Sequence, residues 1–305
     1  MRKIKKIKNK KAEITTQQIV LLIVLIASFA VILFFILRIN PGKTSEIEVC
    51  HNSVITRGTG VLPTKEILPL NCKTSYVCLT KDGSCEQLTS PKIEKIKTQE
   101  QAYSFLANQM ADCWWMFGEG EVNYLSKDLL KSNLYCSICS QLAFDDSLNN
   151  VFPNGEIDRR DFYDYLSRTN ISGKEQSYLD YIVGVKSSQE IKSTLQNSNS
   201  DFGKITFDKQ YYLVMGTVAD VSVLKWVGLG ILAGAGTAVI ILTAGVAAPV
   251  IVAVILGVGT GGTGGYFLGT MVEGASGSSY LTPTIIEANS QDFASLNCKD
   301  IKTIA

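Results

Sequence analysis

The apolar stretch IVLLIVLIASFAVILFFIL, residues Ile19–Leu37, decides how this chain is organised. It holds nineteen residues without a charge, and as an α-helix it would extend about 29 Å, which matches the hydrocarbon core of a bilayer. Its apolar side chains surround the helix, whereas the core helix of a soluble domain has one polar face. Arg38-Ile39-Asn40-Pro41 follows, and not the small-x-small site of a cleaved secretory signal. The stretch therefore predicts an uncleaved signal anchor, a transmembrane helix over residues 19–38.

The segment before this helix, residues 1–18, is strongly basic. It contains seven Lys and Arg residues and one acid, so it carries +6, whereas the whole 305-residue chain carries +1. The remainder is therefore about −5, which argues against a nucleic-acid-binding protein. Lys and Arg resist translocation, so the segment predicts a cytoplasmic tail with the following chain outside. An arm that binds nucleic acid or lipid headgroups is the alternative, but the adjacent apolar stretch favours the anchor.

The N-terminal residues also carry a family resemblance. Lys11-Ala12-Glu13, then Thr15-Thr16-Gln17-Gln18 and the apolar run, resemble the class III signal of archaeal type IV pilins. This resemblance covers residues 1–37 and implies that a peptidase cuts between Ala12 and Glu13. The apolar run begins six residues after that bond. The chain as a whole resembles uncharacterised membrane proteins of small-genome archaea, and that resemblance implies no activity.

A second uncharged region, Trp226–Val272, holds 47 residues. One helix of this length would reach about 70 Å, more than twice the bilayer core. We therefore expect two spans, near residues 225–244 and 249–272, joined by a turn at Gly245-Val246-Ala247-Ala248-Pro249. The sequence predicts a glycine-rich transmembrane helical hairpin over residues 225–272.

Glycines recur in this region at helical spacing, and those expected to make helix-packing surfaces are Gly230, Gly234, Gly257, Gly261, Gly265 and Gly269. On a helix, residues four apart share a face, and a glycine ridge lets another backbone approach closely. We expect the two arms to pack on each other or on the first helix. Self-association, around a pore or otherwise, and insertion into a second bilayer are the alternatives. The region contains no acid, base or amide side chain, which argues against a wide aqueous pore.

The polar residues 40–222 predict an α+β domain outside the membrane, and residues 273–305 an extracytoplasmic C-terminal segment. Alternating patterns predict strands over residues 75–80, 134–142, 211–215 and 280–287, the last rejoining the main domain. Asp82-Gly83 predicts a hairpin turn with a return over residues 85–88. Apolar residues at helical spacing predict helices over residues 98–117, 157–168 and 174–185, the first capped by Thr98 with Gln101.

Eight cysteines follow the first apolar stretch: Cys50, Cys72, Cys78, Cys85, Cys113, Cys136, Cys139 and Cys298. An even number outside a membrane predicts disulfides, and the spacing leaves their connectivity open. We expect Cys298 to pair with one of the other seven and so tie the C-terminal segment to the main domain. Zinc is an alternative, although only Cys136 and Cys139 have the close spacing of a zinc-binding pair. A thioredoxin-like redox pair at Cys136-x-x-Cys139 is another.

Three further motifs have both a structural and a functional interpretation. Trp114-Trp115 near Glu119 and Glu121 could hold and cleave a sugar, but the helical spacing favours a structural use. His51 is the single histidine and is expected to be structural or exposed. Asn170-Ile171-Ser172 is an N-glycosylation sequon, meaningful only outside the membrane. The chain contains no Gly-rich phosphate loop, HExxH motif or nucleophile elbow, so we expect no cofactor and no metal.

These observations predict a multi-pass membrane protein with a disulfide-stabilised α+β ectodomain. We expect a non-enzymatic cell-surface or assembly protein, a scaffold whose partners are the lipid bilayer and either another copy or another membrane protein, and not nucleic acid. A pore-forming or membrane-active protein that acts through the glycine-rich hairpin is the alternative. An extracytoplasmic thiol-disulfide oxidoreductase that uses Cys136 and Cys139 is a third hypothesis.

Overall fold

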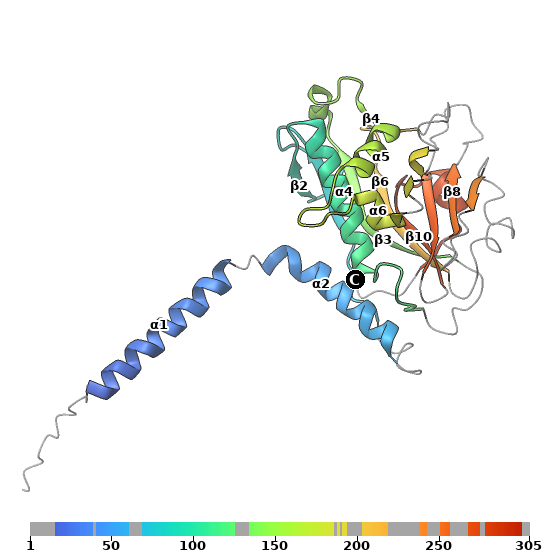
Figure 1. Cartoon of the computed structure of the whole chain (residues 1–305). Helices are drawn as coiled ribbons and strands as arrows, with labels where there is room; N and C mark the ends of the chain where they lie inside the picture. The colour runs from blue at the N-terminus through green and yellow to red at the C-terminus, as the bar shows by residue number, and fades with distance from the viewer. Residues whose placement is uncertain are drawn as a thin grey trace, which may run out of the picture. The chain divides into compact units, whose positions relative to one another are not determined.

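Figure 1 shows the computed structural model, which describes residues 16–38, 41–60, 69–125, 134–185, 188–189, 191–193, 203–218, 238–242, 251–256, 268–274 and 278–300. The chain divides into two compact units, residues 1–45 and 46–305. Helix α1 (Thr16–Arg38) lies in the first unit and confirms the helix predicted over residues 19–38. Among the described helices, α1 is the one that is long and apolar enough to cross a membrane.

The second unit is built on a mixed β-sheet, and the described residues contribute nine strands to it. In spatial order these are β2 (Lys92–Lys95), β1 (Ser75–Thr80), β3 (Tyr135–Phe144), β6 (Tyr211–Val218), β10 (Ser279–Glu287), β9 (Leu268–Glu273), β8 (Ile251–Leu256) and β7 (Ala238–Leu242), with β11 (Lys299–Asp300) also beside β3. β1 is parallel to β2 and β3, and β11 is parallel to β3. All pairs from β3 to β7 are antiparallel.

The remaining described elements are helices and one small sheet. They are α2 (Pro41–Thr59), α4 (Gln99–Met116), the 3-10 helix η2 (Asp146–Asn150), β4 (Glu156–Asp158), α5 (Arg159–Arg168), α6 (Tyr178–Val183), β5 (Lys204–Thr206) and α9 (Gln291–Ser295). β4 and β5 pair with each other in an antiparallel two-stranded sheet. Figure 1 shows α4, α5 and α6 gathered on one face of the large sheet.

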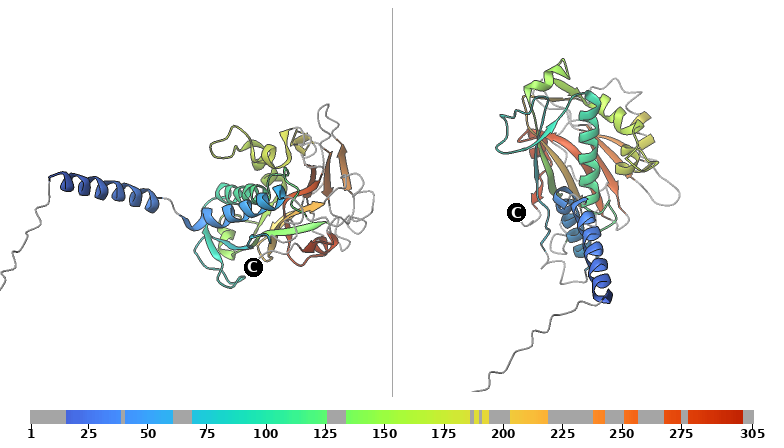
Figure 2. Two further views of the ribbon diagram at one scale, coloured as in Figure 1. Left: turned by 90° about the horizontal axis from the view of Figure 1, so that it is seen from below. Right: turned by 90° about the vertical axis from the view of Figure 1, so that its left-hand side faces the viewer.

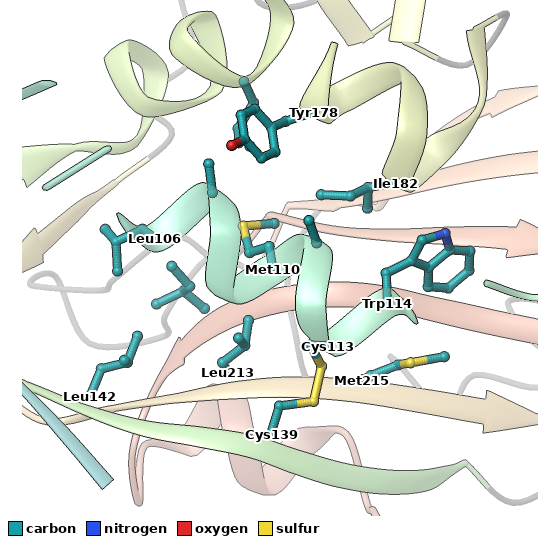
Figure 3. Close-up of a cluster of buried hydrophobic side chains, with 14 of the residues drawn as sticks. Leu106, Met110, Cys113, Trp114, Cys139, Leu142, Tyr178, Ile182, Leu213 and Met215 are labelled. Carbon is teal, nitrogen blue, oxygen red and sulfur yellow. A yellow bond between two sulfur atoms is a disulfide. The ribbon is translucent and has the colours of Figure 1, made fainter. Parts of the chain in front are cut away.

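The main core lies between helix α4 and the centre of the sheet. Figure 3 shows Leu106, Met110 and Cys113 of α4 directed toward β3 and β6, where Leu142, Leu213 and Met215 receive them. These six side chains are buried, and Tyr178 and Ile182 of α6 pack against the other side of α4. Burying a large apolar side chain contributes about 1.5–3 kcal/mol, so this contact supplies much of the stability of the unit.

The opposite face of the sheet carries a second, smaller core. Side chains alternate along β6: Leu213 and Met215 belong to the main core, whereas Val214 and Val218 belong to the second. This alternation follows from the two-residue period of a strand. The segment around α9 covers the second core through Leu296, which is fully buried. The sheet is therefore apolar on both faces at β6.

Four disulfides pair all eight cysteines: Cys50–Cys72, Cys78–Cys85, Cys113–Cys139 and Cys136–Cys298. The first joins α2 to the segment before β1, and the second closes the loop after β1. The third joins α4 to β3, and the fourth joins β3 to the C-terminal segment. The prediction that the cysteines form disulfides, with Cys298 paired to one of the other seven, is confirmed.

Most of the predicted elements of the polar domain are present, with shifted ends. The strand over residues 280–287 is confirmed as β10, which rejoins the main domain beside β6. Thr98 caps α4 by accepting a hydrogen bond from the Gln101 nitrogen at 3.2 Å. The Gln101 side chain reaches back to the Lys97 nitrogen at 2.8 Å and not to Thr98. Residues 157–168 begin as a strand, β4, before α5 starts at Arg159.

The hairpin predicted at Asp82-Gly83 is wrong. The chain after β1 does not return antiparallel over residues 85–88, because β2 begins at Lys92 and pairs parallel to β1. Asp82 accepts hydrogen bonds from the nitrogen and hydroxyl of Ser84, at 2.9 and 2.6 Å. With the Cys78–Cys85 disulfide, these bonds fold residues 82–85 into a closed loop, which leaves no residues for an adjacent return strand.

The helices predicted over residues 225–244 and 249–272 are wrong wherever the structure describes this region. Residues 238–242, 251–256 and 268–273 are the strands β7, β8 and β9. Val and Ile dominate the first two, and β-branched residues fit a pleated strand as well as an apolar helix. Glycine at 269 lies in β9 opposite Ile255, and the other five glycines of the expected ridge lie outside the described residues.

The length of the chain that each disulfide closes predicts a difference in stability. Cys136–Cys298 closes a loop of 162 residues, and Cys78–Cys85 closes a loop of 7. The longer loop removes more conformational entropy from the unfolded chain, so its disulfide should stabilise the fold more. The chain-entropy relation gives about 5 against about 2.5 kcal/mol. We expect Cys136→Ala with Cys298→Ala to lower the unfolding free energy by about 2.5 kcal/mol more than Cys78→Ala with Cys85→Ala. Urea unfolding of the full chain in detergent, followed by tryptophan fluorescence, measures both, and equal losses would contradict this account.

Candidate functional site

Helix α1 is the first functional candidate, because its apolar side chains are exposed. The window Gln17–Phe34 has a mean hydropathy of 2.6, and none of it is buried. Leu21 and Val24 are 67% and 61% exposed. Among the residues of this helix whose side chains the structure describes, none belongs to either apolar core. An exposed apolar surface of this size is typical of a segment that meets a membrane or a partner.

The Cys136-x-x-Cys139 motif does not form a redox pair in the structure. Cys136 is bonded to Cys298 and Cys139 to Cys113. Both cysteines are at least nine-tenths buried, and they belong to the two different apolar cores. Because all eight cysteines are disulfide-bonded, none is a thiolate that could bind zinc or attack a disulfide.

The tryptophan pair has a structural role. Trp114 is 4% exposed and packs edge-on against Tyr280, with ring centroids 6.2 Å apart. Trp115 stacks on His51 at 3.9 Å, and His51 Nδ1 donates to the Trp115 carbonyl oxygen at 2.6 Å. These contacts join the end of α4 to β10 and to α2. Trp114 is too deeply buried to stack on a sugar.

The acidic residues that follow the tryptophans do not face each other across a cleft. Glu119 has a positive φ of 55° between Gly118 and Gly120, and its Oε1 accepts a hydrogen bond from the Tyr181 hydroxyl. This bond joins the turn after α4 to α6. Glu121 is exposed. The loop therefore ends a helix and braces its neighbour, as the structural interpretation predicts.

A polar cleft of about 220 Å³ is the second functional candidate. It lies where α4, the loop after η2, the β4–β5 sheet and the first turn of α5 meet. Its lining residues are Gln99, Tyr103, Phe152, Pro153, Asn154, Glu156, Asp158, Asp161 and Lys204. Sequence reasoning missed this cleft because its walls come from three separate stretches of the chain. The one local signal is Glu156-Ile157-Asp158, in which two acids flank a residue that proves fully buried.

Local hydrogen bonds position the acids of the cleft. Glu156 and Asp158 lie on the same face of β4, and Lys204 of β5 forms an ion pair with Glu156. Asp158 caps α5 by accepting a hydrogen bond from the Arg160 nitrogen at 2.7 Å. Asp161 lies in the first turn of that helix. Glu156 and Asp158 therefore have structural partners. The position of Asp161 is fixed by helix α5, which Asp158 caps.

The electrostatics of the cleft favour a positive ligand group. Partial burial raises the pKa of Asp161, and the nearby carboxylates of Asp158 and Asp164 raise it further. Burial also raises the pKa of Tyr103, with Asp161 and Asp158 as the next causes. Arg160 and Arg168 act on Asp161 in the opposite direction. The cleft can hold a small polar or cationic group by hydrogen bonds and charge.

The chemistry available in the cleft is limited to carboxylates, one phenol, one ammonium and amides. Its described lining holds no serine, cysteine or histidine. Within the described residues, no group of three or more His, Cys, Asp or Glu side chains converges as a metal site. The cleft is therefore a candidate for binding a small polar or cationic group.

Comparisons with known proteins assign no family to this chain: no family model, no curated protein and no solved structure matches it.

The raised pKa of Asp161 predicts how stability depends on pH. Its folded-state pKa lies above the unfolded value, so the folded protein binds the proton more tightly and its stability falls as pH rises through these values. We expect Asp161→Asn to raise the free energy of unfolding at pH 7, and with it the midpoint temperature, by less than about 1 kcal/mol at this exposed site. Near pH 3 the substitution should leave both unchanged.

Asp164→Asn provides the control on the same helix. It removes the exposed ion pair of Asp164 with Arg168, at 3.3 Å, and also the repulsion between Asp164 and Asp161, so it should change stability at pH 7 less than Asp161→Asn does. Thermal unfolding of both variants at the two pH values measures the effect. A lower midpoint for Asp161→Asn at pH 7 would show that the site stabilises this carboxylate.

Proposed function

We propose that this protein is a membrane-anchored, non-enzymatic surface or assembly component whose disulfide-braced α+β domain lies outside the membrane. The observation that carries the proposal is the combination of one fully exposed apolar helix with a domain that holds four disulfides. The helix needs an apolar surrounding, and disulfides persist in oxidising compartments. The two features together favour an anchor followed by an ectodomain.

The distribution of charge supports the orientation. Residues 1–18 carry seven bases and stand immediately before α1, as a cytoplasmic flank does. The resemblance of this segment to the class III signal of type IV pilins supports a role in assembly. Under that hypothesis the mature protein begins at Glu13 and keeps α1. The partners we propose are the lipid bilayer and either a second copy of this chain or another membrane protein.

The anchor is tested by placing charge at the centre of α1. Each arginine at the middle of a membrane helix costs about 2.5–3.5 kcal/mol, so Leu25→Arg with Ile26→Arg should release the full chain from membranes into alkaline carbonate. Val49→Arg with Ile93→Arg places the same charges on exposed residues of the second unit and should leave the chain in the membrane pellet. Retention of the Leu25/Ile26 variant would sink the anchor hypothesis.

The side of the domain is measured in the same cells. We expect a membrane-impermeant maleimide to label Cys298 only after reduction, because Cys298 is bonded to Cys136. Labelling that requires permeabilised cells even after reduction would put the domain inside and overturn the proposal. The mass of the N-terminal peptide reports whether the chain begins at Glu13.

A second candidate, membrane insertion by residues 226–272, is favoured by one observation. This stretch holds 47 residues without a charge, which is long enough to reach across a bilayer and back once β7, β8 and β9 leave the sheet that they form with β10. Under this alternative the purified chain should release an entrapped dye from liposomes, and Val254→Lys in β8 should abolish the release. Under our main proposal neither protein releases dye.

A further inference from the structure

The loop between α5 and α6 carries a motif to which the proposed function gives no role. Asn170-Ile171-Ser172 is the single Asn-x-Ser/Thr sequence in the 305-residue chain. Figure 2 shows the yellow-green loop between α5 and α6 extending away from the helices. Such a sequence matters only where the asparagine side chain is accessible and on the outer side of a membrane.

The backbone around the motif forms a closed local turn. Asn170 forms a β-bridge with Ser177, and the Ile171 nitrogen donates to the Gln176 carbonyl at 3.0 Å. At the tip, the Lys174 nitrogen donates to the Ile171 carbonyl at 3.0 Å, and Gly173 supplies a positive φ of 78°. These backbone bonds hold the loop without help from the side chains of Asn170 and Ser172.

The side chains of the motif divide between core and solvent. Ile171 is half-buried and packs against the main core, whereas Asn170 and Ser172 on either side of it are exposed. Neither of these two exposed side chains is hydrogen-bonded to another residue in the part of the chain that the structure describes. A group attached to Asn170 therefore displaces no contact there, and Ile171 keeps the loop in place.

We propose that Asn170 is an N-glycosylation site of the ectodomain, with Ser172 as the hydroxyl residue that a membrane-bound oligosaccharide transferase recognises. This inference rests on the proposed function, because it needs the domain to be on the side where the sugar donor is presented. The donor is an oligosaccharide linked through phosphate to a membrane lipid.

The reaction forms one bond and breaks one bond. The Asn170 Nδ2 attacks the anomeric carbon of the donor, and the bond from that carbon to the phosphate oxygen breaks. The phosphate leaves on the lipid with the electron pair of the broken bond, and Nδ2 loses one proton to a base of the transferase. No group is oxidised or reduced.

The attached sugar would change the surface of this loop. A glycan is bulky and strongly hydrated, so it would cover the tip at Gly173 and Lys174, which is exposed. Trypsin cleaves after lysine and arginine, and the tip lies between Arg168 and Lys174. The native glycoprotein should therefore resist trypsin at Lys174 more than the unmodified protein does.

The test uses protein purified from the membranes of the cells that make it. Complete digestion of the reduced, unfolded chain with trypsin yields the peptide Thr169–Lys174, sequence TNISGK. We expect its mass to be raised by whole sugar residues, with fragment ions of the sugars. Asn170→Gln and Ser172→Ala should abolish the glycopeptide, whereas Ser172→Thr keeps the motif and should retain it.

Labelling with impermeant maleimide after reduction, on the same cells, separates failure of this proposal from failure of the proposed function. An unmodified TNISGK peptide in a domain that is labelled outside overturns the glycosylation site and leaves the anchored ectodomain standing. A domain that stays unlabelled in intact cells overturns both. A glycan that persists in Ser172→Ala also overturns the proposal, because the modification would not depend on the motif.

Discussion

The packing of helix α4 against the centre of the sheet is the contact on which the rest of the second unit depends. One face of α4 covers β3, β6 and β10, and α5 and α6 pack on the faces that remain. The Cys113–Cys139 disulfide ties the same helix to β3. The turn after α4 then positions Glu119 against Tyr181 of α6. Without α4 in place, one face of the sheet would lose its apolar cover, and α5 and α6 would lose the apolar surface on which they pack.

The centre of the sheet combines distant parts of the chain. β10 pairs with β6 along its length, although the whole stretch 219–278 separates them in sequence. The C-terminal segment then returns to β3 through β11 and through the Cys136–Cys298 disulfide. Because these contacts are between residues far apart in sequence, the chain must close long loops before it gains their energy. The last disulfide holds that closure once it is made.

Some elements could be predicted from the sequence because they follow one periodicity. α4 has an N-cap and a continuous apolar stripe, and β10 a run of apolar and β-branched residues. Helix α2 was missed because its buried positions are Cys50, Val54 and Arg57, which do not form an apolar stripe by composition. The region of β7–β9 could not be assigned, since short apolar runs rich in Val and Ile have no period that separates helix from strand. The cleft was missed because no local pattern brings Gln99, Asp161 and Lys204 together.

The Cys136-x-x-Cys139 motif illustrates why spacing acquires chemical meaning only with secondary structure. At the start of a helix, two cysteines three apart lie close enough to bond to each other. In β3 they lie on opposite faces of the sheet. Cys136 lies in the second core and is bonded to Cys298 of the C-terminal segment, whereas Cys139 lies in the main core and is bonded to Cys113 of α4. The two disulfides therefore fasten the covering layer on each side of the sheet to the same strand. Such bonds resist separation of the two layers, and disulfides of this kind persist in oxidising compartments.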